Sequence, residues 1–235
     1  SQVKFVNSLE EDLKRRDFTV NSLAAAENFD GDVNILDYFG GKKDIEKKII
    51  RCVGNPSDRF EEDALRILRA LRFSAELSFN IENKTAQAII EKRELIKYIS
   101  GERKVEELRK LLKNGQTEAI FREFYAVFSE IVGNFAENGI DSVKGGFCEK
   151  LFYILRFRPL AEFEKIISEL KISSSEKSSI AEYKKIFDFC GGAVTFENFF
   201  QIISRHGYFA AEYLKIFGEY ESFSHIFEDK AIPKT

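Results

Sequence analysis

The chain has 235 residues, of which 44% are hydrophobic and 32% are charged, and its formal net charge is -3. This balance is ordinary for a globular protein and excludes a uniformly basic nucleic-acid binder, so any site for a polyanion must be local. No apolar run approaches the ~18 residues that a membrane-spanning helix needs, so no membrane span is expected.

Cysteine and histidine usage argues against several kinds of site. The three cysteines are far apart in the sequence and only two histidines occur, so neither a disulfide framework nor a zinc site is expected. A reducing, cytoplasmic location without a signal peptide fits this usage. The sequence contains no methionine, so we expect it to be a fragment of a longer protein.

The first 53 residues mix helix and strand signals. Ser8 and Glu11 have the spacing of a capping box, and Asp30-Gly31 is a strong hairpin signal. The expected elements are a strand end at 2–6, a short helix after Ser8, a second helix over Asn21–Ala26 capped by Asp17 or Thr19, hairpin strands near 27–29 and 33–36, a turn over 37–41, a helix around 44–48 and a strand over 49–53.

Arg15, Arg16 and Asp17 fall at the junction between the two short helices expected near the start of the chain. One interpretation makes them capping residues and solvated charges. The other places guanidinium groups near phosphate and the carboxylate near a ribose hydroxyl.

The stretch Arg59–Leu77 predicts one amphipathic helix that begins near Asp58, with Ser57 or Asp58 as the cap after Pro56. Its apolar face has helical spacing, and its polar stripe carries arginine without lysine. The apolar face comprises Ala64, Leu65, Ile67, Leu68, Leu71 and Ala75, and the polar stripe comprises Glu62, Asp63, Arg66, Arg69 and Arg72.

Asp63 and Arg66 on this stripe form a pair with a definite hydrogen-bonding pattern. A carboxylate beside a guanidinium complements the amine and ring nitrogen of cytosine or adenine, whereas uracil and guanine present the wrong groups. An ordinary solvated face explains the same spacing, because a Glu62–Arg66 or Asp63–Arg66 pair contributes only ~0.3–0.5 kcal/mol there.

Everything after Pro56 has helical periodicity. Helices are expected over Asn83–Arg93 and Ser100–Lys113, and residues 84–113 contain nine basic against five acidic side chains. That surplus could contact a phosphate backbone or be solvated helix surface. Of the 24 phenylalanines, 17 lie beyond residue 120, at spacings typical of helix packing, and glycine pairs at 145–146 and 191–192 predict breaks between helices.

Four segments occur in one order and at close spacing: RRDFTVNSLA (15–24), LDYFGGKKDI (36–45), EDALRILRALRF (62–73) and ISGERKVEEL (99–108). This set resembles the class II tRNA nucleotidyltransferase (CCA-adding enzyme) and bacterial poly(A) polymerase family over about residues 2–115. The resemblance implies a mainly α fold, in which the C-terminal part of an α/β nucleotidyltransferase head is followed by an elongated, all-helical neck, body and tail. It divides the chain into head (1–53), neck (54–115), body (116–192) and tail (193–235).

The resemblance also implies roles for the residues in these segments. The RRDxxxN motif binds the ribose and phosphates of the incoming nucleotide, and the EDxxR motif reads its base. Residues 37–44 match a flexible motif that adjusts between C and A addition, and Glu102, Arg103 and Glu106 match an ERxxxE-like element that stabilises the central helices. The nucleotide-binding residues implied are Arg16, Asp17, Asn21, Asp63, Arg66 and Arg69, with Arg15 as a further candidate.

The function implied for the intact protein is template-independent addition of CCA to tRNA 3′ ends from CTP and ATP. The family's catalytic carboxylates, which bind Mg²⁺ for phosphoryl transfer, would precede residue 1, so no catalytic or metal-binding residue is expected in this sequence. CC-adding, A-adding and poly(A) polymerase activities within the family stay open, as does a non-catalytic helical RNA-binding module. The sequence leaves the oligomeric state undefined.

Overall fold

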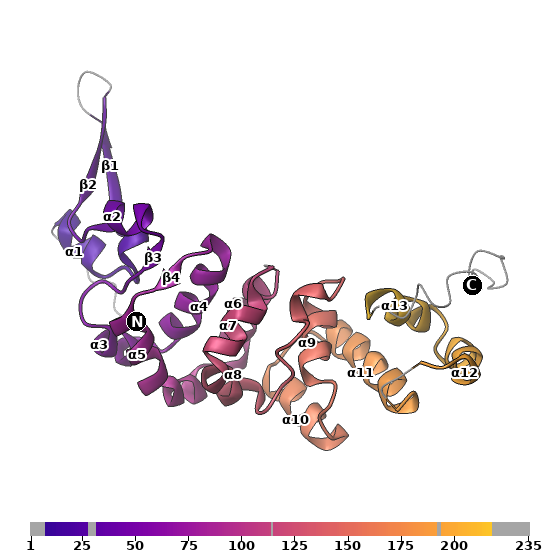
Figure 1. Cartoon of the computed structure of the whole chain (residues 1–235). Helices are drawn as coiled ribbons and strands as arrows, with labels where there is room; N and C mark the ends of the chain where they lie inside the picture. The colour runs from indigo at the N-terminus through magenta and orange to yellow at the C-terminus, as the bar shows by residue number, and fades with distance from the viewer. Residues whose placement is uncertain (1–7, 28–31, 114, 192–193, 218–235) are drawn as a thin grey trace. The chain divides into compact units, whose positions relative to one another are not determined.

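The computed structural model describes residues 8–27, 32–113, 115–191 and 194–217, with helices and strands labelled in Figure 1. Helices dominate, which confirms the predicted mainly helical fold class. The chain divides into two compact units, residues 1–133 and 134–235. Within the described ranges, no helix is long and apolar enough to cross a membrane.

The first unit begins with short mixed elements and continues as a stack of helices (Figure 1). Its α-helices are α1 (Leu9–Lys14), α2 (Gly41–Glu46), α3 (Pro56–Glu62), α4 (Leu65–Leu77), α5 (Asn83–Glu91), α6 (Gly101–Leu111), α7 (Thr117–Glu123) and α8 (Tyr125–Val132). Its strands are β1 (Leu23–Glu27), β2 (Val33–Asp37), β3 (Ile49–Ile50) and β4 (Asn80–Ile81), and its 3-10 turns are η1 (Thr19–Asn21) and η2 (Arg93–Tyr98).

The hairpin of β1 and β2 projects away from the helices of its unit (Figure 1). The strands are antiparallel, with Ala25 opposite Ile35, and this pairing confirms the predicted hairpin. The predicted helix over Asn21–Ala26 is wrong, because its alanines lie in β1, where strand pairing overrides their helix propensity. The predicted strand at 2–6 and the Asp30-Gly31 turn lie outside the described residues.

Gly41 is the first residue of α2 and lies against the backbone of η1. A Cβ atom there would be 2.2 Å from the carbonyl oxygen of Thr19, so Gly41→Ala must displace one of the two segments. We expect a loss of about 1–3 kcal/mol in the free energy of unfolding, measured by urea denaturation. Gly115→Ala is the matched control, since a Cβ there meets no atom within 4 Å; equal stability of the two variants would contradict the close contact.

The predicted continuous helix over residues 58–77 is wrong, because the chain forms two helices that are interrupted at Asp63. Asn55, not Ser57 or Asp58, caps α3, and Pro56 is its first residue. Asp63 has extended backbone angles, φ -151° and ψ 103°, and its side-chain oxygen accepts the N–H of Leu65 at 3.1 Å. Aspartate competes in this way with the helix for backbone donors, which lets α4 begin afresh after it.

Helix α4 packs its apolar side against the first unit's core, where Ile67, Leu68 and Leu71 are buried as predicted. Arg72 departs from the predicted solvated stripe, since only 7% of it is exposed. Its guanidinium donates from Nε to the buried Glu107 of α6 at 2.6 Å and lies 3.9 Å from the centre of the Phe73 ring. The polar stripe of α4 is therefore partly a helix-packing surface.

Two parts of the first unit follow the prediction closely. The helix predicted over Ser100–Lys113 is confirmed as α6, which Ser100 caps and whose Val105, Leu108 and Leu111 are buried. Phe121 and Phe128, on α7 and α8, are also buried, with ring centres 4.5 Å apart.

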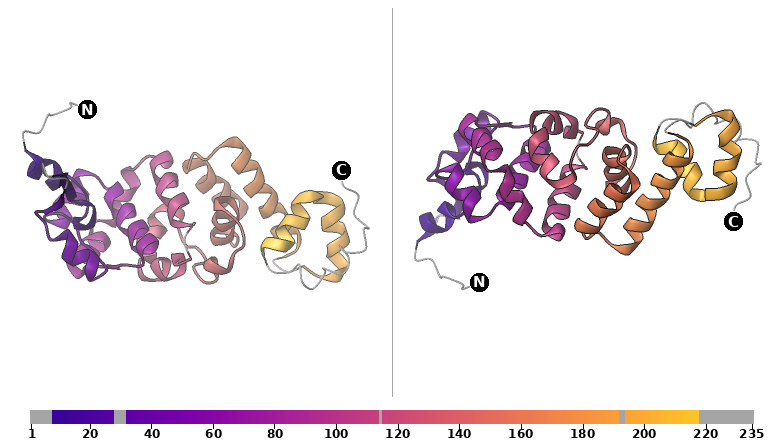
Figure 2. Two further views of the ribbon diagram at one scale, coloured as in Figure 1. Left: turned by 90° about the horizontal axis from the view of Figure 1, so that it is seen from above. Right: turned by 90° about the horizontal axis from the view of Figure 1, so that it is seen from below.

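The second unit is helical throughout its described elements. These are η3 (Ile140–Ser142), α9 (Phe147–Leu155), α10 (Leu160–Glu169), α11 (Ser174–Phe189), α12 (Phe196–His206) and α13 (Tyr208–Ile216). Helices α9 and α11 pack through Phe152 and Tyr183, whose ring centres are 5.8 Å apart, and α12 and α13 lie side by side next to α11 (Figure 2). Gly146 directly precedes α9, which confirms the break predicted there.

The three cysteines, all within the described part of the chain, form no disulfide. Burial raises the pKa of the Cys52 thiol to about 12, so this thiol stays protonated near neutral pH. Cys52 also forms a single antiparallel bridge with Phe18, which ties the segment before η1 to the chain after β3.

Candidate functional site

Asp17 lies between two arginines of α4 and joins the start of the first unit to that helix. Its Oδ1 accepts from Arg66 Nε at 3.0 Å, and its Oδ2 accepts from Arg69 Nε at 2.6 Å. The side chains of Asp17 and Arg66 are only 17% and 13% exposed, so the pair is well shielded from solvent. These contacts bring together three of the predicted nucleotide-binding residues, since Asp17 is 49 positions from Arg66 and 52 from Arg69 in the sequence.

Arg66 is the most extensively bonded residue of this group. Its Nη1 donates to the carbonyl of Arg59 at 2.9 Å and to Glu62 at 2.8 Å, whereas its Nη2 makes only a 3.5 Å contact with the carbonyl of Arg15. Burial alone would lower the pKa of Arg66, but hydrogen bonds with Glu62 and Asp17 outweigh burial and raise it. The guanidinium is therefore fixed and charged, with Nη2 as its least engaged nitrogen.

Asp63 does not pair with Arg66, although the sequence placed the two on one helical face. Its Oδ1 accepts the N–H of Leu65, the first residue of α4, and its Oδ2 accepts from Arg103 Nη2 of α6 at 2.9 Å. The Asp63 side chain is 36% exposed, and it lines a pocket of about 290 Å³ together with Arg103 and Tyr98. Asp63 is therefore oriented by two donors while remaining open to solvent.

Arg16 and Asn21 are held next to each other at the turn around η1. Arg16 Nη1 donates to the carbonyl of Asn21 at 2.9 Å, and Asn21 Oδ1 accepts the N–H of Phe18 at 3.1 Å. The side chains of Arg15 and Arg16 are 54% and 46% exposed, and each contacts Asp12. Both guanidinium groups can thus reach a ligand.

The segment Asp37–Asp44 forms a tightly bonded turn and short helix. The Asp37 carboxylate accepts backbone N–H groups from Phe39, Gly41 and Lys42 at 2.9–3.3 Å. Burial acts to raise the pKa of Asp37, but these N–H donors outweigh burial and lower it. Asp44 is buried and accepts from Thr19 at 2.7 Å and from Arg51 at 3.0 Å, so both carboxylates serve the local fold.

Sequence reasoning missed Glu107 and Arg59. The spacing ERxxxE, counted from Glu102, ends at Glu107 rather than at the Glu106 named for it, and Glu107 is the buried carboxylate that bonds Arg72. A careful count of that motif could have found Glu107. Arg59 contacts residues 15 and 16, at sequence separations of 44 and 43, and no local spacing signals such a contact.

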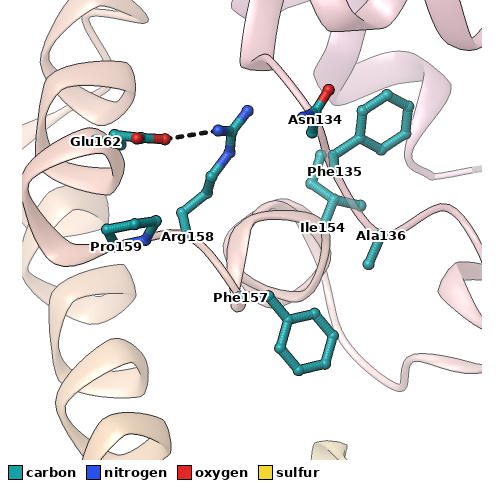
Figure 3. A pocket seen from close by; sticks show the side chains of 8 residues that line it. All are labelled: Asn134, Phe135, Ala136, Ile154, Phe157, Arg158, Pro159 and Glu162. Carbon is teal, nitrogen blue, oxygen red and sulfur yellow. Dashed lines mark hydrogen bonds and ion pairs between the residues drawn. The ribbon is translucent and has the colours of Figure 1, made fainter.

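Metal-ligating side chains do not converge in the described part of the chain, where no group of three or more His, Cys, Asp or Glu is suited to hold an ion. The described residues therefore do not fit a Mg²⁺ site. The second unit has its own pocket of about 420 Å³, lined by Asn134, Phe135, Ala136, Ile154, Phe157, Arg158, Pro159 and Glu162 (Figure 3). None of the predicted site residues lies in that pocket.

Two family models match the first unit. Residues 1–51 match the poly A polymerase head domain, and residues 78–126 match the probable RNA and SrmB-binding site of polymerase A. The CCA-adding enzyme of Bacillus subtilis is 53% identical over 113 residues, a match that covers 48% of this chain and 28% of that protein. The chain thus matches less than a third of that curated relative.

Solved structures extend the likeness to nearly the whole chain. The Bacillus stearothermophilus CCA-adding enzyme in complex with CTP superposes with a TM-score of 0.68 at 28% identity, covering 96% of this chain and 61% of that chain. The Thermotoga maritima CCA-adding enzyme complexed with tRNA shares the fold, with a TM-score of 0.72 at 20% identity, covering 94% of this chain and 60% of that chain. The motifs, the fold and these matches all support similarity of this chain to the class II tRNA nucleotidyltransferase (CCA-adding enzyme) and bacterial poly(A) polymerase family.

Proposed function

We propose that the intact protein adds CCA to the 3′ end of tRNA from CTP and ATP, and that Asp63 and Arg66 select the base. The observation that carries this proposal is the Asp17 carboxylate held by Arg66 and Arg69. It joins the segment proposed to bind ribose and phosphates directly to the helix proposed to read the base. The names of the matched relatives and the CTP complex of one of them support the same assignment.

The proposed reading of the base uses atoms that remain open in the structure. Asp63 keeps unused acceptor lone pairs beside its two bonds and accepts the exocyclic amine of cytosine or adenine. Arg66 donates from Nη2 to the adjacent ring nitrogen of the same base. Uracil presents a carbonyl oxygen to the Asp63 carboxylate, and guanine presents an N–H to the guanidinium, so both are rejected.

The proposed contacts with ribose and triphosphate come from the turn around η1. Arg16 and Arg69 supply guanidinium donors to phosphate oxygens, for which their planar fork is well suited. Asp17 orients Arg66 and Arg69 and keeps further lone pairs for a ribose hydroxyl, while Asn21 places Arg16 through its carbonyl. Residues 78–126, which match an RNA-binding family model, are proposed to contact the tRNA.

The proposal includes Mg²⁺, which would be held by catalytic carboxylates that the family carries ahead of the region matched here. When bound there, the ion would supply stabilisation of the developing charge on the transferred phosphoryl group. The described residues of this chain would bind and orient the nucleotide.

Incorporation of single nucleotides tests the function. The intact protein is incubated with a tRNA that ends before CCA, using each nucleotide alone and CTP with ATP. We expect CTP alone to add two residues, CTP with ATP to add three and then stop, and UTP and GTP to add none. A tRNA that already ends in CCA is the control. A long tail from ATP alone would indicate a poly(A) polymerase, and tRNA binding without incorporation would indicate a non-catalytic RNA-binding module.

A further inference from the structure

Arg59 on α3 contacts the backbone of the RRD segment directly. Its Nη2 donates to the carbonyl oxygens of Arg15 at 2.6 Å and Arg16 at 3.0 Å, while its Nη1 pairs with Glu62. The Arg59 side chain is only 12% exposed although it carries a charge. Burying a guanidinium is costly unless its donors are bonded, and the buried Nε of Arg59 has no hydrogen-bond partner among the described residues. The contacts of Nη1 and Nη2 therefore hold the side chain in one position.

Arg59, Arg66 and Arg69 together hold three consecutive residues, and we call them the arginine clamp. Arg59 holds the carbonyls of residues 15 and 16, whereas Arg66 and Arg69 hold the Asp17 carboxylate. Arg66 also donates to the carbonyl of Arg59, which ties α3 to α4 across the break at Asp63. The clamp fixes the backbone of the segment while the side chains of Arg15 and Arg16 stay about half exposed.

We propose that Arg59 is a positioning residue for the incoming nucleotide, an inference that rests on the proposed function. It holds the segment that binds ribose and phosphate at a fixed place relative to the helix that reads the base. Without Arg59, only a fraction of molecules would hold the ribose- and phosphate-binding segment correctly placed against the base-reading helix. The apparent affinity for nucleotide would fall by that fraction. Because Arg59 contacts backbone and not a base edge, CTP and ATP are affected equally.

The substitution Arg59→Lys tests this role because it keeps the charge but removes the fork that reaches both carbonyls. With the intact protein and a tRNA that ends before the position added, we expect KM to rise about tenfold for both CTP and ATP, with kcat little changed. Selection against UTP should be unaffected. Arg156→Lys is the matched control, since Arg156 also donates to a backbone carbonyl, that of Tyr153, but lies in the second unit.

Kinetic outcomes separate positioning from a structural role. A fall in kcat with unchanged KM would mean a smaller folded fraction and would overturn the inference, as would unchanged kinetics. Hydrogen exchange gives a second readout at the amides of Thr19 and Val53, which bond across the segment to Arg51 and Asp17. Both amides should exchange faster in Arg59→Lys than in Arg156→Lys, and equal rates would contradict the clamp. A wild-type protein that incorporates no CTP counts against the proposed function alone, and hydrogen exchange then decides the clamp.

Discussion

Replacing Asp63 by alanine is expected to remove most of the preference for CTP over UTP, lowering the ratio of their kcat/KM values by about 10- to 100-fold. The physical reason is that the carboxylate accepts a base amine and repels the carbonyl that uracil presents in the same place. The measurement is single-nucleotide incorporation with CTP and UTP on a tRNA that ends before CCA. Loss of the hydrogen bond from the Leu65 N–H should also cost about 1 kcal/mol of stability, which is measured separately by denaturation.

Three further variants complete this test. Asp63→Asn keeps an oxygen to accept the Leu65 N–H and offers an amine to uracil, so it should accept UTP while remaining stable. Asp58→Ala is the matched control, because Asp58 is an exposed aspartate on the neighbouring helix α3. An unchanged ratio of the kcat/KM values for CTP and UTP in Asp63→Ala would contradict the proposed role of Asp63. Lysine in place of Arg66 should not maintain selection of the base, because a single ammonium group cannot reproduce the planar fork of a guanidinium.

Replacing Glu107 by methionine is expected to destabilise the protein by about 3 kcal/mol, because it removes the buried carboxylate that pairs with the Arg72 guanidinium. The partly exposed Glu76 also pairs with Arg72, which places the loss at the lower end of the usual range. For a chain of this size the thermal midpoint should fall by about 6–12 °C.

The adjacent glutamate supplies the control for this second prediction. Glu106 is exposed on the same helix, so Glu106→Gln should leave stability within about 0.5 kcal/mol of the wild type. Changing Arg72 and Glu107 together to methionine should recover part of the stability, since no charge is then buried without a partner. Equal melting temperatures for the two single variants would contradict a structural role for Glu107.

The sequence predicted correctly a helix whose cap and apolar spacing lie within its own residues. The helix predicted over Ser100–Lys113 is confirmed as α6, with Ser100 as its cap and Val105, Leu108 and Leu111 on its buried face. The three alanines of β1 show the opposite case, because their place in a strand depends on β2 ten residues later. The break at Asp63 was hidden by an apolar periodicity that continues through it, although aspartate itself is a strong helix-start residue.

In the candidate site, too, the sequence predicted the residues but not their contacts. Motif spacing was enough to name Asp17, Asp63, Arg66 and Arg69, but it did not show which of them touch. Asp63 bonds Arg103 rather than Arg66, and Asp17 bonds both α4 arginines, at sequence separations of 40 to 52. Contacts of this kind depend on how helices pack, which periodicity within one helix does not encode. The assignment of these residues to nucleotide binding stays a prediction, as does the fourfold division into head, neck, body and tail.

The most direct test of base selection by Asp63 and Arg66 is a crystal structure of the intact protein with bound CTP. We predict that the cytosine amine lies within hydrogen-bonding distance of the Asp63 carboxylate and that Arg66 Nη2 donates to the adjacent ring nitrogen. The contacts of Asp17 with Arg66 and Arg69 should persist in that complex. A cytosine ring that contacts neither Asp63 nor Arg66 would contradict the proposed mechanism of selection.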